Sequence, residues 1–325
     1  MKNLLVTGGA GFIGSHFVRS ALTGRLPGLQ DARITVLDKM TYAGNFASLG
    51  PVAEHERLDF VPGDVCDAAL VDNVVRHHDA IIHFAAETAA DRSTTAAELF
   101  TTANVVGTQV LLDAALRHGT GRFLHVSANE VYGTIDTGAW TERSPLAPAS
   151  PYAATKAGAD LLVLACHRTH GLPVVVTRAS STYGPYQHPE KTIPRIVTTL
   201  LDGGTVTLDD GGRTTRDWTH VDDHCRGLAL ALHGGRPGET YHIGGSIELS
   251  EHDLTGALLP ECGADWDRVV TVDDGKDHHQ RYALNDDKIR RDLGWRPRIE
   301  FSSGIGATVR WYRDNPDWWR PLLAT

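Results

Sequence analysis

The stretch Asn3-Leu-Leu-Val-Thr-Gly-Gly-Ala-Gly-Phe-Ile-Gly14 decides the fold expected of this chain. Its first five residues suit a short buried strand, and an amphipathic helix from Ser15 to Leu22 follows the glycines. Gly8, Gly11 and Gly14 stand at a Gly-x-x-Gly-x-x-Gly spacing. Glycines so spaced allow a tight turn, close approach of the backbone to a pyrophosphate and close packing of helix on strand, while the helix N-terminus faces the anion. The stretch therefore predicts a dinucleotide-binding strand, loop and helix.

A carboxylate follows the second predicted strand. Arg33-Ile-Thr-Val-Leu37 ends in Asp38, where an acid accepts hydrogen bonds from the adenosine ribose. This carboxylate would repel a 2′-phosphate, so we expect NAD as cofactor rather than NADP. Asp38 could instead be a solvated strand-end residue and the glycines a plain turn. The order of strand, glycines, helix and acid within one unit favours the cofactor site.

Strand and helix patterns alternate after this unit. Such alternation predicts a parallel sheet covered on both faces, with ligands at the carboxyl ends of its strands. Ser127 lies at one such end. The strands are expected at Leu58–Asp64, Ala80–Ala86, Arg122–Ser127 and Pro173–Thr177, and the helices near Val71–His77, Asn104–Arg117 and Pro151–His167.

After Thr177 proline and glycine become frequent and the alternation breaks, which indicates a second lobe. The predicted fold class is α/β, a Rossmann-type doubly wound parallel sheet with a smaller α/β substrate-binding lobe. We expect residues 1–178 to form the NAD-binding domain, with a returning segment at about 215–245, and residues 179–214 and 246–325 to form the second lobe. Asn285 to Leu293 is expected to be a closing helix, and the aromatic stretch from Trp311 to Trp319 to be packing.

Composition excludes several classes. The chain has 325 residues and a net charge of −9, which argues against nucleic-acid binding. Its four cysteines are far apart and form no Cys-x-x-Cys pair, so neither a metal site nor a disulfide framework is expected. The N-terminal apolar run is too short for a signal peptide, and no later run is expected to span a membrane. These features predict a soluble cytoplasmic protein.

A second pattern carries chemistry. Tyr152 and Lys156 lie four residues apart in the stretch Ser150-Pro-Tyr-Ala-Ala-Thr-Lys156, so a helix places a phenol and an ammonium on one face. An ammonium near a phenol favours phenolate, so Tyr152 is expected to act as a base below its ordinary pKa of about 10. Tyr-x-x-x-Lys spacing also arises by chance on exposed helices. The cofactor motif and the nearby Ser127-Ala-Asn-Glu-Val-Tyr-Gly133 give it weight.

At this point the chain resembles the extended short-chain dehydrogenase/reductase family, and most of all its dTDP-glucose 4,6-dehydratase branch, over nearly its whole length. Membership implies a bound NAD that is reduced and reoxidised within one turnover. The matching segments are Gly8–Ser15, His83–Glu87, Asp91–Ser93, Asn104–Thr108, Glu130–Gly133, Ser150–Ala154, Tyr183–Gln187, Pro189–Lys191, Arg216–Trp218 and His220–Asp223.

The resemblance also implies the residues of the site. No metal is implied. Catalysis falls to Tyr152, Lys156 and Glu130, with Asn129 and Ala128 at the two positions before Glu130. The cofactor contacts are Gly8, Gly11, Phe12, Ile13, Gly14, Asp38, Lys39, Asp64, Val65, Ala85, Ala86, Ser127, Tyr152 and Lys156, and the nucleotide-sugar contacts are Thr88, Ala90, Ser181, Lys191, Arg216 and Arg281. The helices at Asn104–Arg117 and Pro151–His167 resemble the pair that builds the family's homodimer, although both could simply cover the sheet.

The chain departs from the family around the sugar. Asn129 replaces the aspartic acid that protonates the departing C6 hydroxyl, and an amide cannot deliver an acidic proton. Ala128 replaces a threonine. Thr88-Ala89-Ala90 and Ser181-Thr182 replace the family's Ser-His-Val and paired asparagines. Differences at Asp209–Gly212 and Asp277–His279 put thymine as the base in doubt.

Three hypotheses remain open from the sequence. The protein could be an NAD-dependent nucleotide-sugar 4,6-dehydratase in which Glu130 or water relays the missing proton. It could be a 4-epimerase, which needs no such proton. It could also bind NAD without turnover, as a redox sensor or scaffold, which the intact Tyr152 and Lys156 disfavour.

Overall fold

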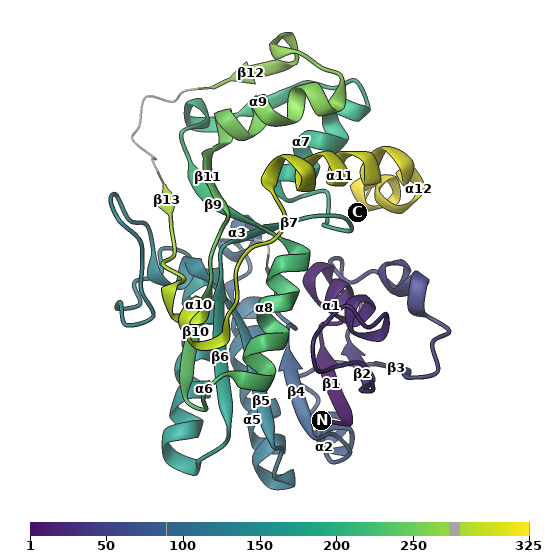
Figure 1. Ribbon diagram of the computed structural model, residues 1–325, viewed down its shortest axis with the longest axis vertical. Helices are drawn as coiled ribbons and strands as arrows, with labels where there is room; N and C mark the ends of the chain where they lie inside the picture. Colours follow the sequence, from purple (N-terminus) through teal and green to yellow (C-terminus); the bar gives the residue numbers. More distant parts are fainter. Residues whose placement is uncertain (89, 273–279, 325) are drawn as a thin grey trace.

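The computed structural model describes residues 1–88, 90–272 and 280–324. Its larger half is a seven-stranded sheet of order β10-β6-β5-β4-β1-β2-β3 in which all neighbours are parallel, as Figure 1 shows. This is the Rossmann order extended by one strand, with its switch point between β1 and β4. The predicted fold class is confirmed. The strands are β1 (Asn3–Thr7), β2 (Arg33–Asp38), β3 (Leu58–Pro62), β4 (Ala80–His83), β5 (Arg122–Ala128), β6 (Val174–Ala179) and β10 (Glu239–Ile243).

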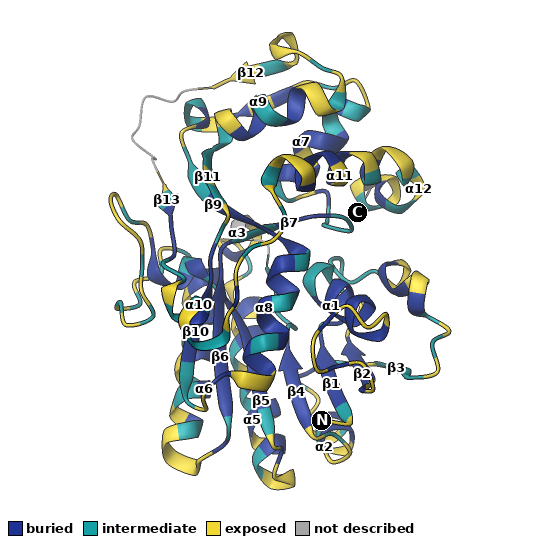
Figure 2. Ribbon diagram, viewed as in Figure 1, coloured by how far each residue is buried: buried dark blue, intermediate teal, exposed yellow. Residues whose placement is uncertain are grey.

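Two hydrophobic cores lie on the two faces of this sheet, so its central strands are buried on both sides (Figure 2). Burial on both faces explains the runs of Val, Ile and Leu in these strands. One face is covered by α1 (Phe12–Leu22), η1 (Phe46–Val52), α8 (Val221–Gly234) and α10 (Asp287–Leu293). The other is covered by α2 (Ala68–Val75), α5 (Gly107–His118) and α6 (Pro151–His170).

The smaller lobe has its own core and its own sheets. In its four-stranded sheet β11 (Ile247–Ser250) and β13 (Arg281–Tyr282) flank β9 (Thr215–His220), which also pairs with β7 (Ser181–Tyr183). A two-stranded sheet joins β8 (Val206–Leu208) and β12 (Val269–Thr271). Its helices are α7 (Thr192–Leu201), α9 (Glu251–Cys262), α11 (Phe301–Asp314) and α12 (Pro316–Trp319), and short turns η4 (Asp209–Gly212), η5 (Trp266–Arg268) and η6 (Arg320–Ala324) complete it.

The chain crosses between the lobes at slightly different places than the sequence indicates. β9 belongs to the smaller sheet, so the return to the large sheet begins with α8 at Val221 rather than near residue 215. α10 lies within the predicted second lobe in sequence, yet Ile289 packs into the core beside α1 and α8. The predicted aromatic cap packs as expected: Trp319 is buried, and Trp311, which lies within α11, contacts the ring of Tyr186.

One helical run is long and apolar enough to cross a membrane, contrary to expectation. It covers Ala97–His118 and consists of α4 (Ala97–Thr101), η2 (Thr102–Val106) and α5. In the structure α5 packs against α2 and α6. Of the apolar 18-residue segment within this run, 44% is buried inside the protein. Core helices of soluble proteins give the same signal.

Candidate active site

A cavity of about 720 Å³ opens at the carboxyl ends of β1, β2, β4, β5 and β6 and reaches the smaller lobe. Segments distant in sequence meet on its wall. The wall includes Gly8, Gly11–Gly14, Asp38, Lys39, Gly63–Cys66, Phe84–Thr88, Val126–Glu130, Tyr152, Lys156, Ala179–Thr182, Gln187, His188, Glu190–Ile193, Arg216, Trp218 and His224.

The glycine loop has the geometry that its spacing predicts. Gly8 adopts φ +69°, and a Cβ there would lie 2.5 Å from the backbone nitrogen of Ala85. A Cβ on Gly14 would collide with the carbonyl oxygen of Gly8, so both positions require glycine. On Gly11 a Cβ would meet only that same oxygen, at 3.4 Å. Gly11 is also the N-cap of α1 and offers no capping side chain, so the first amides of α1 remain available for a pyrophosphate.

Asp38 lies at the end of β2, on the cavity wall. Its two carboxylate oxygens accept hydrogen bonds from the backbone nitrogens of Ala10 and Met40, at 2.9 and 2.8 Å. Burial raises the pKa of this carboxyl. Next to it, the Lys39 ammonium lies 2.7 Å from Asp64. The adenosine end of the cavity is therefore bounded by carboxylates, which suits free ribose hydroxyls.

Tyr152 and Lys156 both lie on α6 and line the cavity. The Lys156 Nζ donates to the carbonyl oxygen of Val126 at 2.8 Å, and burial lowers the lysine pKa to about 8. Burial, followed by the negative charge of Glu130, raises the pKa of Tyr152. The pKa of Tyr152 in the free protein is therefore shifted in the direction opposite to the expectation from sequence, because burial and nearby negative charges raise it.

The residues after β5 face the same space. Ala128, Asn129 and Glu130 lie where β5 passes into the short turn η3 (Asn129–Tyr132). Asn129 is 2% exposed, and within the described chain its Nδ2 has no hydrogen-bond partner. Ser127 Oγ is likewise buried without a partner among the described residues. Glu130 Oε1 lies 3.8 Å from Arg216 of β9, so the two lobes meet at this carboxylate.

Most of the predicted nucleotide-sugar contacts are brought to the cavity. Thr88, Ser181, Lys191 and Arg216 line it. Lys191 Nζ donates to the carbonyl oxygen of Thr88 at 2.9 Å, and the Arg216 guanidinium lies over the Tyr282 ring at 4.9 Å.

Within the described part of the chain, Arg281 does not line this cavity. Arg281 donates to both Glu248 oxygens and to the carbonyl oxygen of Gly138, so its guanidinium joins β11 of the smaller lobe to the segment between η3 and α6. Ala90 begins the short helix α3 (Ala90–Ser93), and its side chain is outside the described part. The differences noted at residues 277–279 also lie outside the described residues.

The cavity wall also contains residues that were not predicted from the sequence as contacts, among them Gln187, His188, Trp218 and His224. In the described part of the chain each carries a buried side-chain atom without a partner: Gln187 Oε1, His188 Nε2, Trp218 Nε1 and His224 Nε2. Gln187 and Trp218 stand inside segments already matched to the family. His224 lies outside the motifs found in the sequence. Only its position on α8 in the folded protein places it at the cavity.

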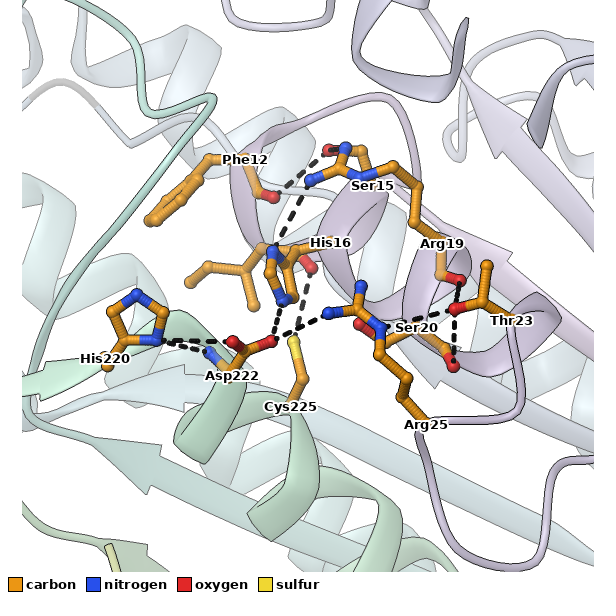
Figure 3. Close-up of polar contacts among 11 residues, drawn as sticks. Phe12, Ser15, His16, Arg19, Ser20, Thr23, Arg25, His220, Asp222 and Cys225 are labelled. Atoms are coloured by element: carbon orange, nitrogen blue, oxygen red, sulfur yellow. Dashed lines mark hydrogen bonds and ion pairs between the residues drawn. The ribbon is translucent and has the colours of Figure 1, made fainter. Parts of the chain in front are cut away.

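Helix α1, which begins at the glycine loop, and helix α8 are connected by side-chain contacts (Figure 3). Asp222, in the first turn of α8, accepts a hydrogen bond from His16 Nε2 of α1 at 2.6 Å and lies 3.5 Å from Arg25. His220 Nδ1 accepts the backbone N–H of Asp222 and caps α8. The first turn of α8, which carries His224, is thereby held against the helix that starts at the glycine loop.

Fold and cavity together define a class: dinucleotide-binding α/β enzymes with a second lobe for the substrate. Comparison with known proteins narrows it. The family model described as GDP-mannose 4,6 dehydratase matches residues 5–308. The dTDP-glucose 4,6-dehydratase of Streptomyces niveus is 56% identical over 98% of this chain and 95% of its own.

Solved structures agree. The dTDP-glucose 4,6-dehydratase of Streptomyces venezuelae, crystallised with NAD and TYD bound, is 57% identical with a TM-score of 0.96, covering 98% of this chain and 99% of that one. A UDP-glucose 4-epimerase from Thermotoga maritima is 26% identical with a TM-score of 0.88, covering 97% and 99%. This chain belongs to the extended short-chain dehydrogenase/reductase family, in its dTDP-glucose 4,6-dehydratase-like branch.

Proposed function

We propose that this protein is an NAD-dependent nucleotide-sugar 4,6-dehydratase that acts on dTDP-glucose. One observation carries the proposal: a single cavity joins the glycine loop, the Tyr152 and Lys156 pair, Glu130 and the cations of the smaller lobe. The relatives and the solved dehydratases support dehydration over epimerisation, since they are far more similar to this chain than the epimerase is.

The side chains divide the work as follows. Bound NAD supplies the acceptor for hydride from C4 of the sugar and the donor of hydride to C6. Tyr152, as the phenolate, accepts the proton of the C4 hydroxyl, so that a 4-keto sugar forms. The positive charges of Lys156 and of bound NAD would favour the phenolate, whereas in the free protein the phenol is neutral. The new carbonyl acidifies the C5 hydrogen, and Glu130 removes it as general base. The C6 hydroxyl then leaves as water once it has received a proton.

Asn129 cannot protonate the departing C6 hydroxyl, because its amide can donate a hydrogen bond but not an acidic proton. Glu130, protonated after taking the C5 hydrogen, is one acid on the cavity wall that could supply the proton, and water is another source. Absence of a positioned general acid typically costs about 10²- to 10⁴-fold in rate. We therefore propose a slow dehydratase.

The test is incubation of the NAD-loaded protein with dTDP-glucose in heavy water, followed by NMR. A 4-keto-6-deoxy product with deuterium at C5 is expected. An inverted C4 with the C5 hydrogen retained would establish the 4-epimerase instead. Bound NAD with no product and no NADH would establish the sensor or scaffold hypothesis.

We further propose that the protein is a cytoplasmic homodimer. All four cysteines are free thiols, which suits a reducing compartment. Leu99, Val106 and Leu161 are 57%, 47% and 56% exposed, and they lie on α4, η2 and α6, which pack side by side. Exposed apolar side chains on adjacent helices suit a four-helix contact with a second copy.

A further inference from the structure

His224 is buried at the wall of the cavity, on the first turn of α8. Its Nδ1 lies 2.8 Å from the Thr182 hydroxyl, and Nε2 has no hydrogen-bond partner among the described residues. A buried polar atom without a partner is costly, so such an atom at a ligand cavity indicates a group that the ligand satisfies.

The hydrogen bonds of Thr182 determine which nitrogen carries the proton. The Thr182 hydroxyl has one hydrogen and two neighbours, the carbonyl oxygen of Ser180 at 3.2 Å and His224 Nδ1 at 2.8 Å. The Ser180 oxygen can only accept, so both contacts are hydrogen bonds only when the hydroxyl donates to Ser180 and Nδ1 carries the proton, and Nε2 then presents a lone pair. Burial lowers the pKa of His224 to about 3, which keeps the ring neutral.

Thr182 orients a second acceptor as well. Its carbonyl oxygen accepts a hydrogen bond from Gln187 Nε2 at 2.9 Å, which leaves Gln187 Oε1 without a partner in the described chain. Gln187 also lines the cavity. One residue thus holds two unsatisfied acceptors at the same wall.

We infer that His224, through Nε2, accepts a hydrogen bond from an N–H or O–H group of the bound ligand, and that Thr182 fixes the tautomer that makes this possible. The chemistry required is a neutral donor. It is present in the carboxamide and ribose hydroxyls of NAD and in the hydroxyls of the sugar. The inference rests on the proposed function, which brings both ligands to this cavity.

A matched pair of variants tests it. An asparagine amide reaches the place of Nδ1 and can still bond to Thr182, whereas a glutamine amide reaches toward the place of Nε2. The dissociation constant for NAD is measured by isothermal titration, and dTDP and dTDP-glucose are then titrated into the NAD-loaded protein. Thermal melting confirms that each variant is folded.

His224→Asn is expected to weaken one ligand about tenfold, the loss of one hydrogen bond to a buried acceptor, while His224→Gln keeps most of the affinity. Loss toward NAD identifies the cofactor as the donor, and loss toward dTDP-glucose but not dTDP identifies the sugar. In ¹⁵N NMR the free protein should show Nδ1 protonated, and the Nε2 signal should shift on addition of that ligand.

Equal affinities in His224→Asn and the unaltered protein, or equal losses in both variants, would overturn this inference alone. Unaltered protein that binds neither NAD nor dTDP-glucose would overturn the proposed function instead.

Discussion

Asn129 presents an amide where removal of a hydroxyl calls for an acid. Its Nδ2 is buried at the cavity and finds no partner in the described chain, so it is free to bond to a ligand oxygen. Replacement of Asn129 by aspartate exchanges the side-chain NH2 group for an oxygen. It places a titratable carboxyl group at the same position. We therefore expect the rate of the elimination step to depend on this residue.

Asn129→Asp is expected to raise the rate of 4-keto-6-deoxy product formation by about 10²- to 10⁴-fold. The measurement is product formation from dTDP-glucose under single-turnover conditions, with NADH absorbance followed in parallel. Asn129→Ser, which supplies a hydroxyl but no acid, is the control. An unchanged rate in Asn129→Asp would mean that Glu130 or water already delivers the proton efficiently.

Lys156 gives the oxidation step a pH limit. Its pKa is lowered by burial to about 8, so its positive charge at the cavity wall is present below pH 8 and lost above it. NADH formation with dTDP-glucose is therefore expected to decline above about pH 8 in the unaltered protein. Lys156→Met should be slow and flat across this range. The assignment would be wrong if Lys156→Met kept the same pH profile.

At the scale of elements, α1 and α8 form one unit around the glycine loop. Asp222 joins them through His16, and Arg19 of α1 lies over the Tyr186 ring at 4.0 Å. Tyr186 adopts φ +70° and packs on Trp311 of α11. A non-glycine residue in this conformation costs about 1–2 kcal/mol, so these contacts hold the loop from which Gln187 reaches the cavity.

Asp222→Ala is expected to lower the free energy of unfolding by about 1–3 kcal/mol, because it leaves the buried Nε2 of His16 without its partner. Urea denaturation measures this. Asp253→Ala is the matched control, since Asp253 also lies in the first turn of a helix but contacts Ser250 and His252 of the same turn rather than another helix. Equal losses in the two variants would contradict the proposed tie between α1 and α8.

At the scale of the whole molecule, buried histidines make stability depend on pH. The pKa values of His224 and His242 are lowered by burial to about 3, from 6.5. Below pH 6.5 the unfolded chain takes up these protons and the folded protein does not, so stability falls by up to about 1.4 kcal/mol per pH unit for each ring. Asp217, whose pKa burial raises to about 6, opposes one of them between pH 6 and 3.8.

The free energy of unfolding is therefore expected to decrease steadily as the pH falls from 7 to 4. Urea titrations at pH 7, 6, 5 and 4 measure the slope. His242→Gln should reduce it, because one of the two rings is then absent. A stability that stays constant over this range would contradict the argument.

The exposed apolar side chains of Leu99, Val106 and Leu161, on α4, η2 and α6, are the proposed contact between two copies of the chain. Leu161→Glu is expected to convert a dimer into a monomer, because a carboxylate cannot be buried unpaired in an apolar contact. Sedimentation velocity measures this. Val270→Glu is the control, since Val270 is 49% exposed on β12, away from these helices. A dimer that survives Leu161→Glu would place the interface elsewhere.

The sequence by itself determined the sheet, the glycine loop, Asp38 and the positions of Tyr152 and Glu130. Each of these depends on local rules: apolar runs form buried strands, and only glycine tolerates the conformation and close contacts found at Gly8. It also indicated the amide at Asn129.

Only the tertiary structure decided which polar groups face the ligand and in what state. Burial raises the pKa of Tyr152 against the expectation from its lysine neighbour, and Glu248 engages Arg281 away from the cavity. His224 becomes a cavity residue because α8 is held against α1. Burial and pairing arise from segments far apart in the chain, so no local pattern reports them.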